Sequence, residues 1–195
     1  MTKQNDKALT PTIRFSGFAN SWEQRKLGDT FDFLQNNTLS RAELTAEAGA
    51  AKNVHYGDVL IKFGEYLDAS NSALPYISSQ QIADKFKGSL LQDGDVIMAD
   101  TAEDETVGKC TEIAEIQGFP TISGLHTIPM RPRQKFASGY KGNTVLLAVI
   151  DNGIRCVTGC MNDLESSTGT ISKTDSITII EISYVLYNLL PNTER

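Results

Sequence analysis

The chain has 195 residues, of which 40% are hydrophobic and 22% are charged, a composition that excludes a largely disordered protein. Its net charge of −6 disfavours non-specific binding to a polyanion, because such binding depends on neutralising phosphates. No apolar run approaches the roughly 20 residues of a membrane helix, so we expect no membrane partner. The N-terminus is polar, without a secretory signal, and the three cysteines are an odd number. Together these features predict reduced thiols and a cytoplasmic location.

The first part of the chain contains turn and helix signals around short apolar segments. Residues 1–10 are polar and are predicted to be a disordered lead. The run Asn36–Thr38 is a turn signal. Ser40 and Glu43 have the spacing of a capping box, which predicts a short helix that begins at Ser40 and stops at Gly49.

Two later segments share the run Gly-Asp-Val, at residues 56–64 and at residues 93–99. Each consists of turn residues around an apolar run, and we predict two β-strands of one sheet. Between them, residues 78–86 are predicted to form a short helix with Ser78 or Ser79 as its N-cap.

The remaining predicted elements are strands. Residues 106–117 and 121–130 have strand-like patterns, and residues 176–190 are rich in β-branched and aromatic side chains that favour a buried strand or strand pair. Short strands alternate with short helices without a long βαβ rhythm. The sequence therefore predicts an α+β fold, a small mixed sheet with short helices.

Charge is distributed unevenly along the chain. Residues 91–130 carry eight acidic groups and one basic group, whereas residues 131–141 carry four basic groups and no acidic one. The second segment is the clearest basic patch in the sequence, and it is either a local DNA-contacting patch or a solvated turn.

The sequence holds few motifs of catalysis. It has no glycine-rich phosphate loop, no serine nucleophile elbow and no Asn/Asp-Pro-Pro-aromatic methyltransferase motif. We predict that His126 is a satisfied, partly buried histidine. Cys156 and Cys160 form one metal-like pair without a second pair nearby, which argues against structural zinc.

One acidic cluster could hold a divalent cation, and its members are Asp95, Asp100, Glu103, Asp104 and Glu105. A restriction-nuclease core would also place a lysine two residues beyond an acid, and neither Asp-x-Lys nor Glu-x-Lys occurs in the chain. The cluster could equally be a solvated loop, or one of its carboxylates could accept a hydrogen bond from a cytosine amino group.

Five stretches of the sequence stand out as a set: PTIRFSGF at 11–18, WEQRKLGD at 22–29, HYGDVLIK at 55–62, DGDVIMADTAEDETVGK at 93–109 and LHTIPMRP at 125–132. In this order, they resemble the target recognition domain of the DNA specificity subunit of type I restriction–modification systems. The resemblance is specific and covers roughly residues 11–140.

The resemblance implies a non-catalytic domain that reads double-stranded DNA. In this family a specificity subunit carries two such domains separated by long helices, and each domain reads one half of a split target. Modification subunits methylate adenine with S-adenosylmethionine, and a motor-nuclease subunit joins them for cleavage. S-adenosylmethionine, ATP and Mg²⁺ are therefore expected on partner subunits and no cofactor is expected in this chain.

The chain departs from the family pattern in its last part. It is about half the length of a full specificity subunit, and residues 141–195 are predicted to be a divergent C-terminal part that lacks the long spacer helix. Two copies could form a homodimer that restores a pair of recognition domains.

Residue types single out candidate DNA contacts, because Asn and Gln suit adenine while Arg and Lys suit guanine and phosphate. The first candidate loop holds Gln35, Asn36, Asn37 and Arg41. The second holds Ser79, Gln80 and Gln81. Candidate phosphate contacts are Lys62, Arg131, Arg133, Lys135 and Lys141. Each could instead serve ordinary turn or capping chemistry.

Three functions therefore compete. The first is a DNA-reading specificity module. The second is a small metal-dependent nuclease that uses the carboxylates of residues 95–105, and the third is a protein-interaction module without DNA binding.

Overall fold

The computed structural model describes residues 23–70, 73–104, 106–136, 138–139, 141–142, 169–170 and 178–181. The predicted lead at residues 1–10, most of the predicted divergent part and the Cys156–Cys160 pair lie outside these residues. The domain division predicted from the sequence stays a prediction.

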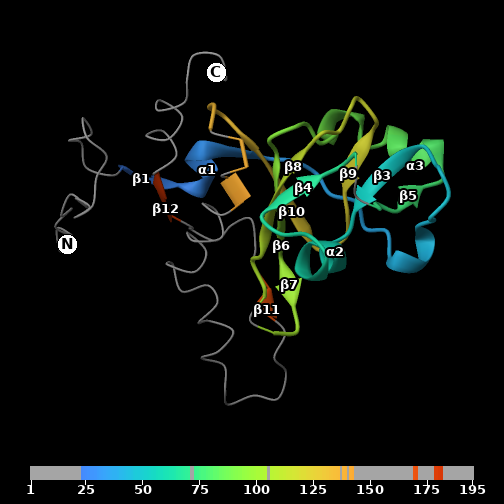
Figure 1. Ribbon diagram of the computed structural model, residues 1–195, viewed down its shortest axis with the longest axis horizontal. Coiled ribbons are helices and arrows are strands. Elements are labelled where there is room, and N and C mark those ends of the chain that lie inside the picture. Colours follow the sequence, from blue (N-terminus) through green and yellow to red (C-terminus); the bar gives the residue numbers. More distant parts are fainter. Residues whose placement is uncertain are drawn as a thin grey trace.

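A five-stranded mixed sheet forms the centre of the protein (Figure 1). Its order is β2 (Phe31–Phe33), β10 (Thr127–Pro132), β6 (Val96–Ala99), β8 (Cys110–Ala114) and β4 (Tyr66–Asp68). Neighbouring strands are antiparallel except β8 and β4, which are parallel.

The central strand β6 is buried on both faces. Val96 and Met98 enter one hydrophobic cluster, whereas Ile97 and Ala99 enter another on the opposite face. Side chains alternate between the two faces of a strand, so a doubly buried strand needs an unbroken apolar run. This confirms the strand predicted in residues 93–99.

A smaller, three-stranded sheet adjoins it, in the order β5 (Tyr76–Ile77), β3 (Ala51–Val54) and β9 (Thr121–Ser123). Helix α3 (Gln80–Asp84) and two 3-10 turns, η1 (Arg41–Glu43) and η2 (Lys87–Ser89), lie around it (Figure 1). A third cluster unites Ala51, Ile77, Ala83 and Ile122, with Leu44 and Ile82 packed against it. The predicted helix cap at Ser79 is confirmed, since its side chain accepts from Ile82 N.

The predicted strand at residues 56–64 is wrong, because this segment forms helix α2 (Tyr56–Ile61). The buried side chains Val59 and Phe63 are four residues apart and pack on the central sheet. His55 caps the helix by accepting a hydrogen bond from Gly57 N at 3.2 Å. A short apolar run does not distinguish strand from helix by itself, and here the cap and the four-residue spacing decide for the helix.

The capping box at Ser40 is present, but the helix predicted after it is only the single turn η1. Glu43 Oε2 accepts from both Ser40 N and Ser40 Oγ, at 2.9 and 2.7 Å. The chain then turns extended, and Thr45 exchanges two backbone hydrogen bonds with Tyr76. Gly49 does not stop a helix. A Cβ at this position would lie 2.5 Å from the carbonyl oxygen of Ile77, so the glycine permits close contact with β5.

The segment 121–130, predicted as one strand, forms β9 and the start of β10 with a turn between them. His126 lies in this turn with a φ of +53°. Its side chain is exposed, not partly buried as predicted, and its ring meets Tyr56 edge to face. The predicted strand in residues 106–117 is confirmed as β8.

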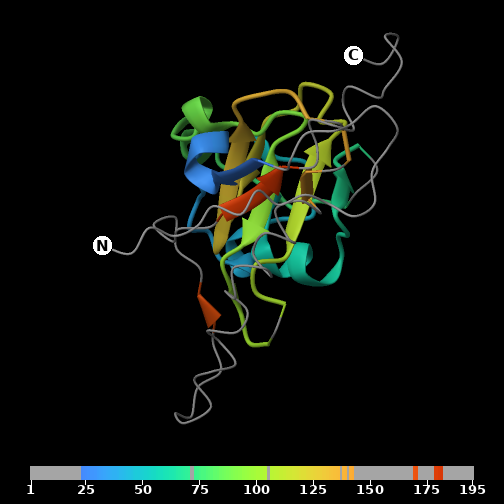
Figure 2. The same cartoon turned by 90° about the vertical axis from the view of Figure 1, so that its left-hand side faces the viewer.

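Distant segments of the sequence pair at the margins of the fold. Strand β1 (Glu23–Lys26), which precedes α1 (Leu27–Thr30), is antiparallel to β12 (Thr178–Glu181). Figure 2 shows β12 in red beside the blue N-terminal segment. The two-residue strands β11 (Gly169–Thr170) and β7 (Thr101–Ala102) also pair. A strand in residues 176–190 is thus confirmed at β12.

The architecture is α+β, as predicted, with mixed sheets and short helices. Among the described residues, no helix has the length and apolar character needed to cross a membrane.

Candidate nucleic-acid interface

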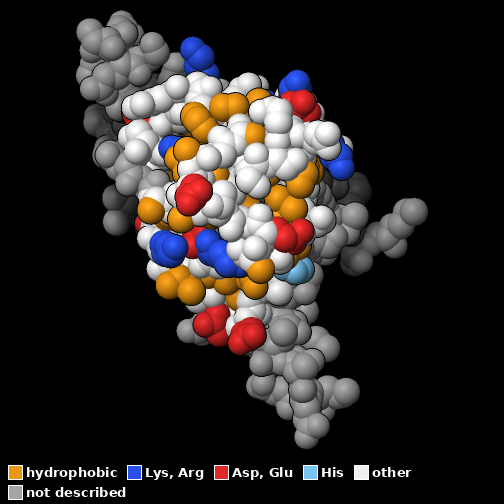
Figure 3. Space-filling model, turned by 90° about the vertical axis from the view of Figure 1, so that its right-hand side faces the viewer, with side chains coloured by type: hydrophobic (Ala, Val, Ile, Leu, Met, Phe, Trp, Pro, Cys, Tyr) orange, Lys and Arg blue, Asp and Glu red, His pale blue; other side chains and the backbone are white. Residues whose placement is uncertain are grey.

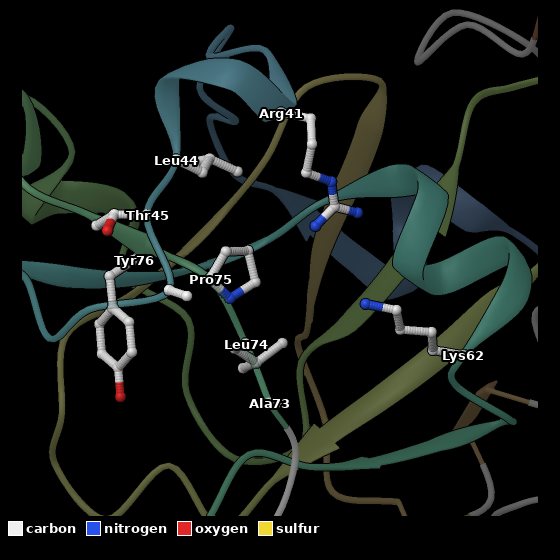
Figure 4. A pocket seen from close by; sticks show the side chains of 9 residues that line it. Arg41, Leu44, Thr45, Lys62, Ala73, Leu74, Pro75 and Tyr76 are labelled. Atoms are coloured by element: carbon white, nitrogen blue, oxygen red, sulfur yellow. The ribbon is translucent and has the colours of Figure 1, made fainter.

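A basic groove lies where η1, the end of α2 and the edge of β5 meet. Its volume is about 500 Å³, and its walls are formed by Arg41, Leu44, Thr45, Ala46, Lys62, Ala73, Leu74, Pro75 and Tyr76. Figure 4 shows the Arg41 and Lys62 side chains pointing toward one another at one end of the groove, with Tyr76 at the other. The structure thus brings together two of the candidate DNA contacts, 21 residues apart in the sequence.

Asp58, in the first turn of α2, joins these two cations. Arg41 Nη2 and Lys62 Nζ lie 2.7 and 2.8 Å from the same oxygen, Asp58 Oδ1. The Asp58 side chain is 1% exposed, whereas those of Arg41 and Lys62 are 47% and 57% exposed. Burial opposes ionisation of this carboxyl, but the hydrogen bonds from Arg41 and Lys62 outweigh it and hold the pKa of Asp58 below its ordinary value.

Local sequence signals place all three charged groups. The capping box holds η1, and Arg41 is the first residue of this turn. Asp58 and Lys62 are four residues apart, a spacing that brings them to the same side of α2. His55 begins that helix as its N-cap acceptor, and burial, together with the charge of Arg41, lowers the pKa of His55. The neutral imidazole is therefore the form that caps α2.

The amide-rich loop after β2 is only partly available to a ligand. Gln35 is exposed and Asn36 is half-buried, with its amide donating to Gly124 O at 3.3 Å. Asn37 is 1% exposed, so its predicted role in base reading is wrong. Its amide nitrogen donates to Asn53 Oδ1 and Ser123 O, and its oxygen accepts from Leu39 N. Asn37 ties the loop to β3 and β9.

The second amide-rich segment is the start of α3. Ser79 is the N-cap residue of this helix, and its hydroxyl oxygen accepts a hydrogen bond from Ile82 N at 3.4 Å. This is the capping role predicted from the sequence as the alternative to a DNA contact. Gln80 and Gln81 are exposed, and the Gln80 amide donates to Asp84 Oδ1 at 2.8 Å. The two glutamines therefore present amides to solvent from the first turn of this helix.

The basic segment 131–141 is largely neutralised by carboxylates. Arg131 forms two hydrogen bonds to buried Asp95, at 2.9 and 2.7 Å, and these raise the pKa of Arg131. Arg133 pairs with exposed Asp32 at 2.8 Å.

Lys141 is 4% exposed, and its Nζ lies 2.6 Å from Glu112 Oε1. Lys141 is too deeply buried to reach a phosphate, so its predicted phosphate contact is wrong. Arg131 is partly exposed, and its donors are taken by both oxygens of Asp95 and by the carbonyl oxygen of Leu90, so its phosphate contact stays a prediction. Lys135 is exposed and lines a second cavity of about 410 Å³ together with Arg133, Gln134 and Phe136. Lys135 and Arg133 stay candidates for phosphate contact.

The acidic cluster predicted as a cation site is divided between different partners. Asp95 belongs to the Arg131 pair, and Asp100 lies 3.4 Å from His126 Nδ1. Asp104 accepts from Thr106 N at 2.9 Å. Within the described part of the chain, no group of three or more His, Cys, Asp or Glu side chains could hold a metal ion.

Sequence reasoning missed Thr45 and Tyr76, which line the groove, and Asp58, which pairs with its two cations. The four-residue spacing of Asp58 and Lys62 was a usable helix signal, but it was outweighed by the apolar run between them. On the face of the molecule that bears the small sheet, lysine and arginine side chains stand in separate groups beside acidic ones (Figure 3). The positive charge there is local and not a broad basic surface.

No protein-family model matches the sequence, and no curated protein matches it. Nine chains of solved structures match this chain, and three of them are described here. The HsdS subunit from Thermoanaerobacter tengcongensis has a TM-score of 0.49, 14% identity and matches 92% of this chain. The type I restriction–modification S subunit from M. genitalium has a TM-score of 0.49, 11% identity and matches 88%.

The third match comes from a structure concerned with complex assembly and conformational transition of the type I restriction–modification system. Its TM-score is 0.50 at 15% identity, over 87% of this chain. The present chain spans 37% of the length of each of the three. At this level of identity the likeness shows the fold alone, and it agrees with the resemblance seen in the sequence. By its fold, the described part of the chain is similar to a chain of the type I restriction–modification system.

Proposed function

We propose that this chain reads one half of a split DNA target as part of a type I restriction–modification specificity subunit. In this role it directs adenine methylation and DNA cleavage by partner subunits and supplies no catalysis itself. The observation that carries the proposal is the ordered set of sequence stretches that resemble target recognition domains, together with a fold similar to theirs. The basic groove supports it, since it offers two exposed cations beside polar side chains.

In the proposed complex, cationic side chains contact the phosphates of DNA and amide side chains contact its bases. Arg41 and Lys62 would contact the phosphate backbone and set the register of the domain on the duplex. Gln35, in the loop after β2, and Gln80 and Gln81, in the first turn of α3, have exposed amides and are the proposed base-reading side chains. A bidentate base contact contributes about 1–3 kcal/mol of discrimination, so a single domain with two or three of them would bind weakly alone.

Because one domain alone would bind DNA weakly, we expect tight DNA binding to depend on partner subunits. We propose that modification subunits, and a second recognition domain supplied by another copy of the chain, raise the affinity by pairing two half-sites. A motor-nuclease subunit would join this complex for cleavage. S-adenosylmethionine, ATP and Mg²⁺ would bind the partners, and the complex would work in the cytoplasm.

The test is co-expression of the chain with a type I modification subunit from its own host, followed by mapping of methylated adenines in the DNA of the expressing cells. We expect methylation at one split sequence, symmetric if two copies pair. A matched expression of the modification subunit alone should give no methylation at that sequence. Complex formation without sequence-specific methylation would contradict the proposed reading of DNA, and absence of a complex would contradict the proposed partnership.

A further inference from the structure

The arrangement around Asp58 is asymmetric in its exposure. The carboxylate is almost completely buried, whereas the two cations that it holds are each about half exposed. Lysine has three N–H donors and arginine five, so each keeps donors beyond the one directed at Asp58 Oδ1. Two cations and one carboxylate leave a net charge of +1, and the unused donors border the groove.

The environment of the second carboxylate oxygen of Asp58 indicates that this residue has a role other than stabilising the fold. Within the described residues, Asp58 Oδ2 is buried and has no hydrogen-bond partner. A buried acceptor without a partner destabilises a fold, so its presence here calls for an explanation other than stability. An ion pair selected for stability alone would be expected to use both carboxylate oxygens, as the Arg131–Asp95 pair does.

Sharing one oxygen also brings the two cationic groups together. Arg41 comes from η1 and Lys62 from the end of α2, and their nitrogens converge because both contact Oδ1 (Figure 4). Long basic side chains lose rotamer freedom when they bind a ligand, and holding them in place beforehand reduces that loss.

We infer that Asp58 is a positioning residue that assembles Arg41 and Lys62 into a preformed site for one phosphate of the DNA backbone. The inference rests on the proposed function and adds to it the number of phosphates bound and the residue that prepares the site. Asp58 itself does not contact the DNA. Its carboxylate stays paired with both cations while their remaining donors bind the phosphate oxygens.

The variant Asp58→Asn separates positioning from simple electrostatics, because the two predict opposite signs. Removing a negative charge should strengthen DNA binding if only net charge matters. If Asp58 positions the cations, affinity should fall about fivefold despite the added positive charge. The measurement is fluorescence anisotropy of the full chain with a labelled mixed-sequence duplex at low salt, repeated in the presence of the modification subunit.

Asp29→Asn is the matched control. Asp29 is an exposed residue of α1, outside the groove and the amide-rich segments, so its substitution changes the net charge equally without disturbing a buried group. We expect this variant to bind DNA as tightly as the unmodified chain or slightly more tightly. If Asp58→Asn binds as tightly as Asp29→Asn, Asp58 is not a positioning residue and the inference is wrong. If the unmodified chain binds no DNA with or without its partner, the proposed function itself fails.

A second measurement does not depend on the folding of the Asp58 variant. The slope of log K against log salt changes by about 0.9 for each phosphate that the protein no longer neutralises. For a shared phosphate, Arg41→Gln/Lys62→Gln should change the slope by about 0.9 in total, and a change of about 1.8 would overturn the inference. Lys62→Arg keeps the charge and the reach of the side chain and should retain the affinity that Lys62→Gln reduces.

Discussion

Two basic regions of this protein differ in how their charge is used. Residues 131–141 are dense in basic side chains, yet three of the four pair with carboxylates that come from elsewhere in the chain. Arg41 and Lys62 are far apart in the sequence, yet they share one buried carboxylate and remain about half exposed. The comparison teaches that local charge density in a sequence does not show where charge is available to a ligand. Availability depends on which carboxylates the fold brings to each cation.

The largest expected effect is on stability, in the 131–141 region. Lys141→Met leaves the Glu112 carboxylate buried without its cation, and we expect the free energy of unfolding to fall by about 3–5 kcal/mol. Urea denaturation measures this loss. The double variant Lys141→Met/Glu112→Leu removes both charges and should recover much of the stability. If the single and double variants are equally unstable, Lys141 does not stabilise the fold through its ion pair with Glu112.

DNA affinity tests the comparison directly with two matched arginines. Arg41 and Arg133 are similarly exposed, at 47% and 51%, and each pairs with a carboxylate. Asp32 neutralises the single charge of Arg133, whereas Asp58 pairs with two cations and leaves a net charge of +1. We expect Arg41→Gln to weaken DNA binding about five- to tenfold, close to 1–1.4 kcal/mol, and Arg133→Gln to change it less than twofold. Titration of both variants against one duplex measures the difference, and a larger loss for Arg133→Gln would reverse our assignment.

Stability of the groove region should depend on pH through His55. Because the pKa of His55 is lowered in the folded protein, the unfolded state binds more protons between that pKa and the ordinary value of 6.5. The stability is therefore complete above about pH 6.5 and falls as the pH drops toward the folded pKa. His55→Asn keeps an acceptor for Gly57 N and should remove this slope, which thermal unfolding at pH 5.5 and 7.5 would measure. If the pH dependence of stability persists in the variant, a group other than His55 causes it.

The smallest expected effect concerns the cap of α3. Ser79 accepts from Ile82 N at a long distance of 3.4 Å, so Ser79→Ala should lower the free energy of unfolding by only about 0.5–1 kcal/mol. Chemical denaturation measures the loss, with Ser78→Ala as the neighbouring control. A loss above about 2 kcal/mol would mean that the hydroxyl does more than cap this helix.

The sequence by itself determined the features that depend on a few neighbouring residues. The apolar run in β6, the cap at Ser79 and the capping box of Ser40 and Glu43 all form as predicted, because alternation and capping act over two to four residues. The resemblance to target recognition domains likewise came from contiguous stretches. These local signals were sufficient for the α+β class and for strands β6, β8, β9, β10 and β12, but they did not predict the other described strands.

Only the tertiary structure decided which candidate residues are free to act. Asn37 and Lys141 have the composition of DNA contacts, but distant strands bury them and supply their partners. Residues 56–61 could have formed a strand, and packing of Val59 and Phe63 on the central sheet favours the helix. That helix places Asp58 where it meets Arg41. Burial and ion pairing depend on groups remote in the sequence, and no local pattern contains that information.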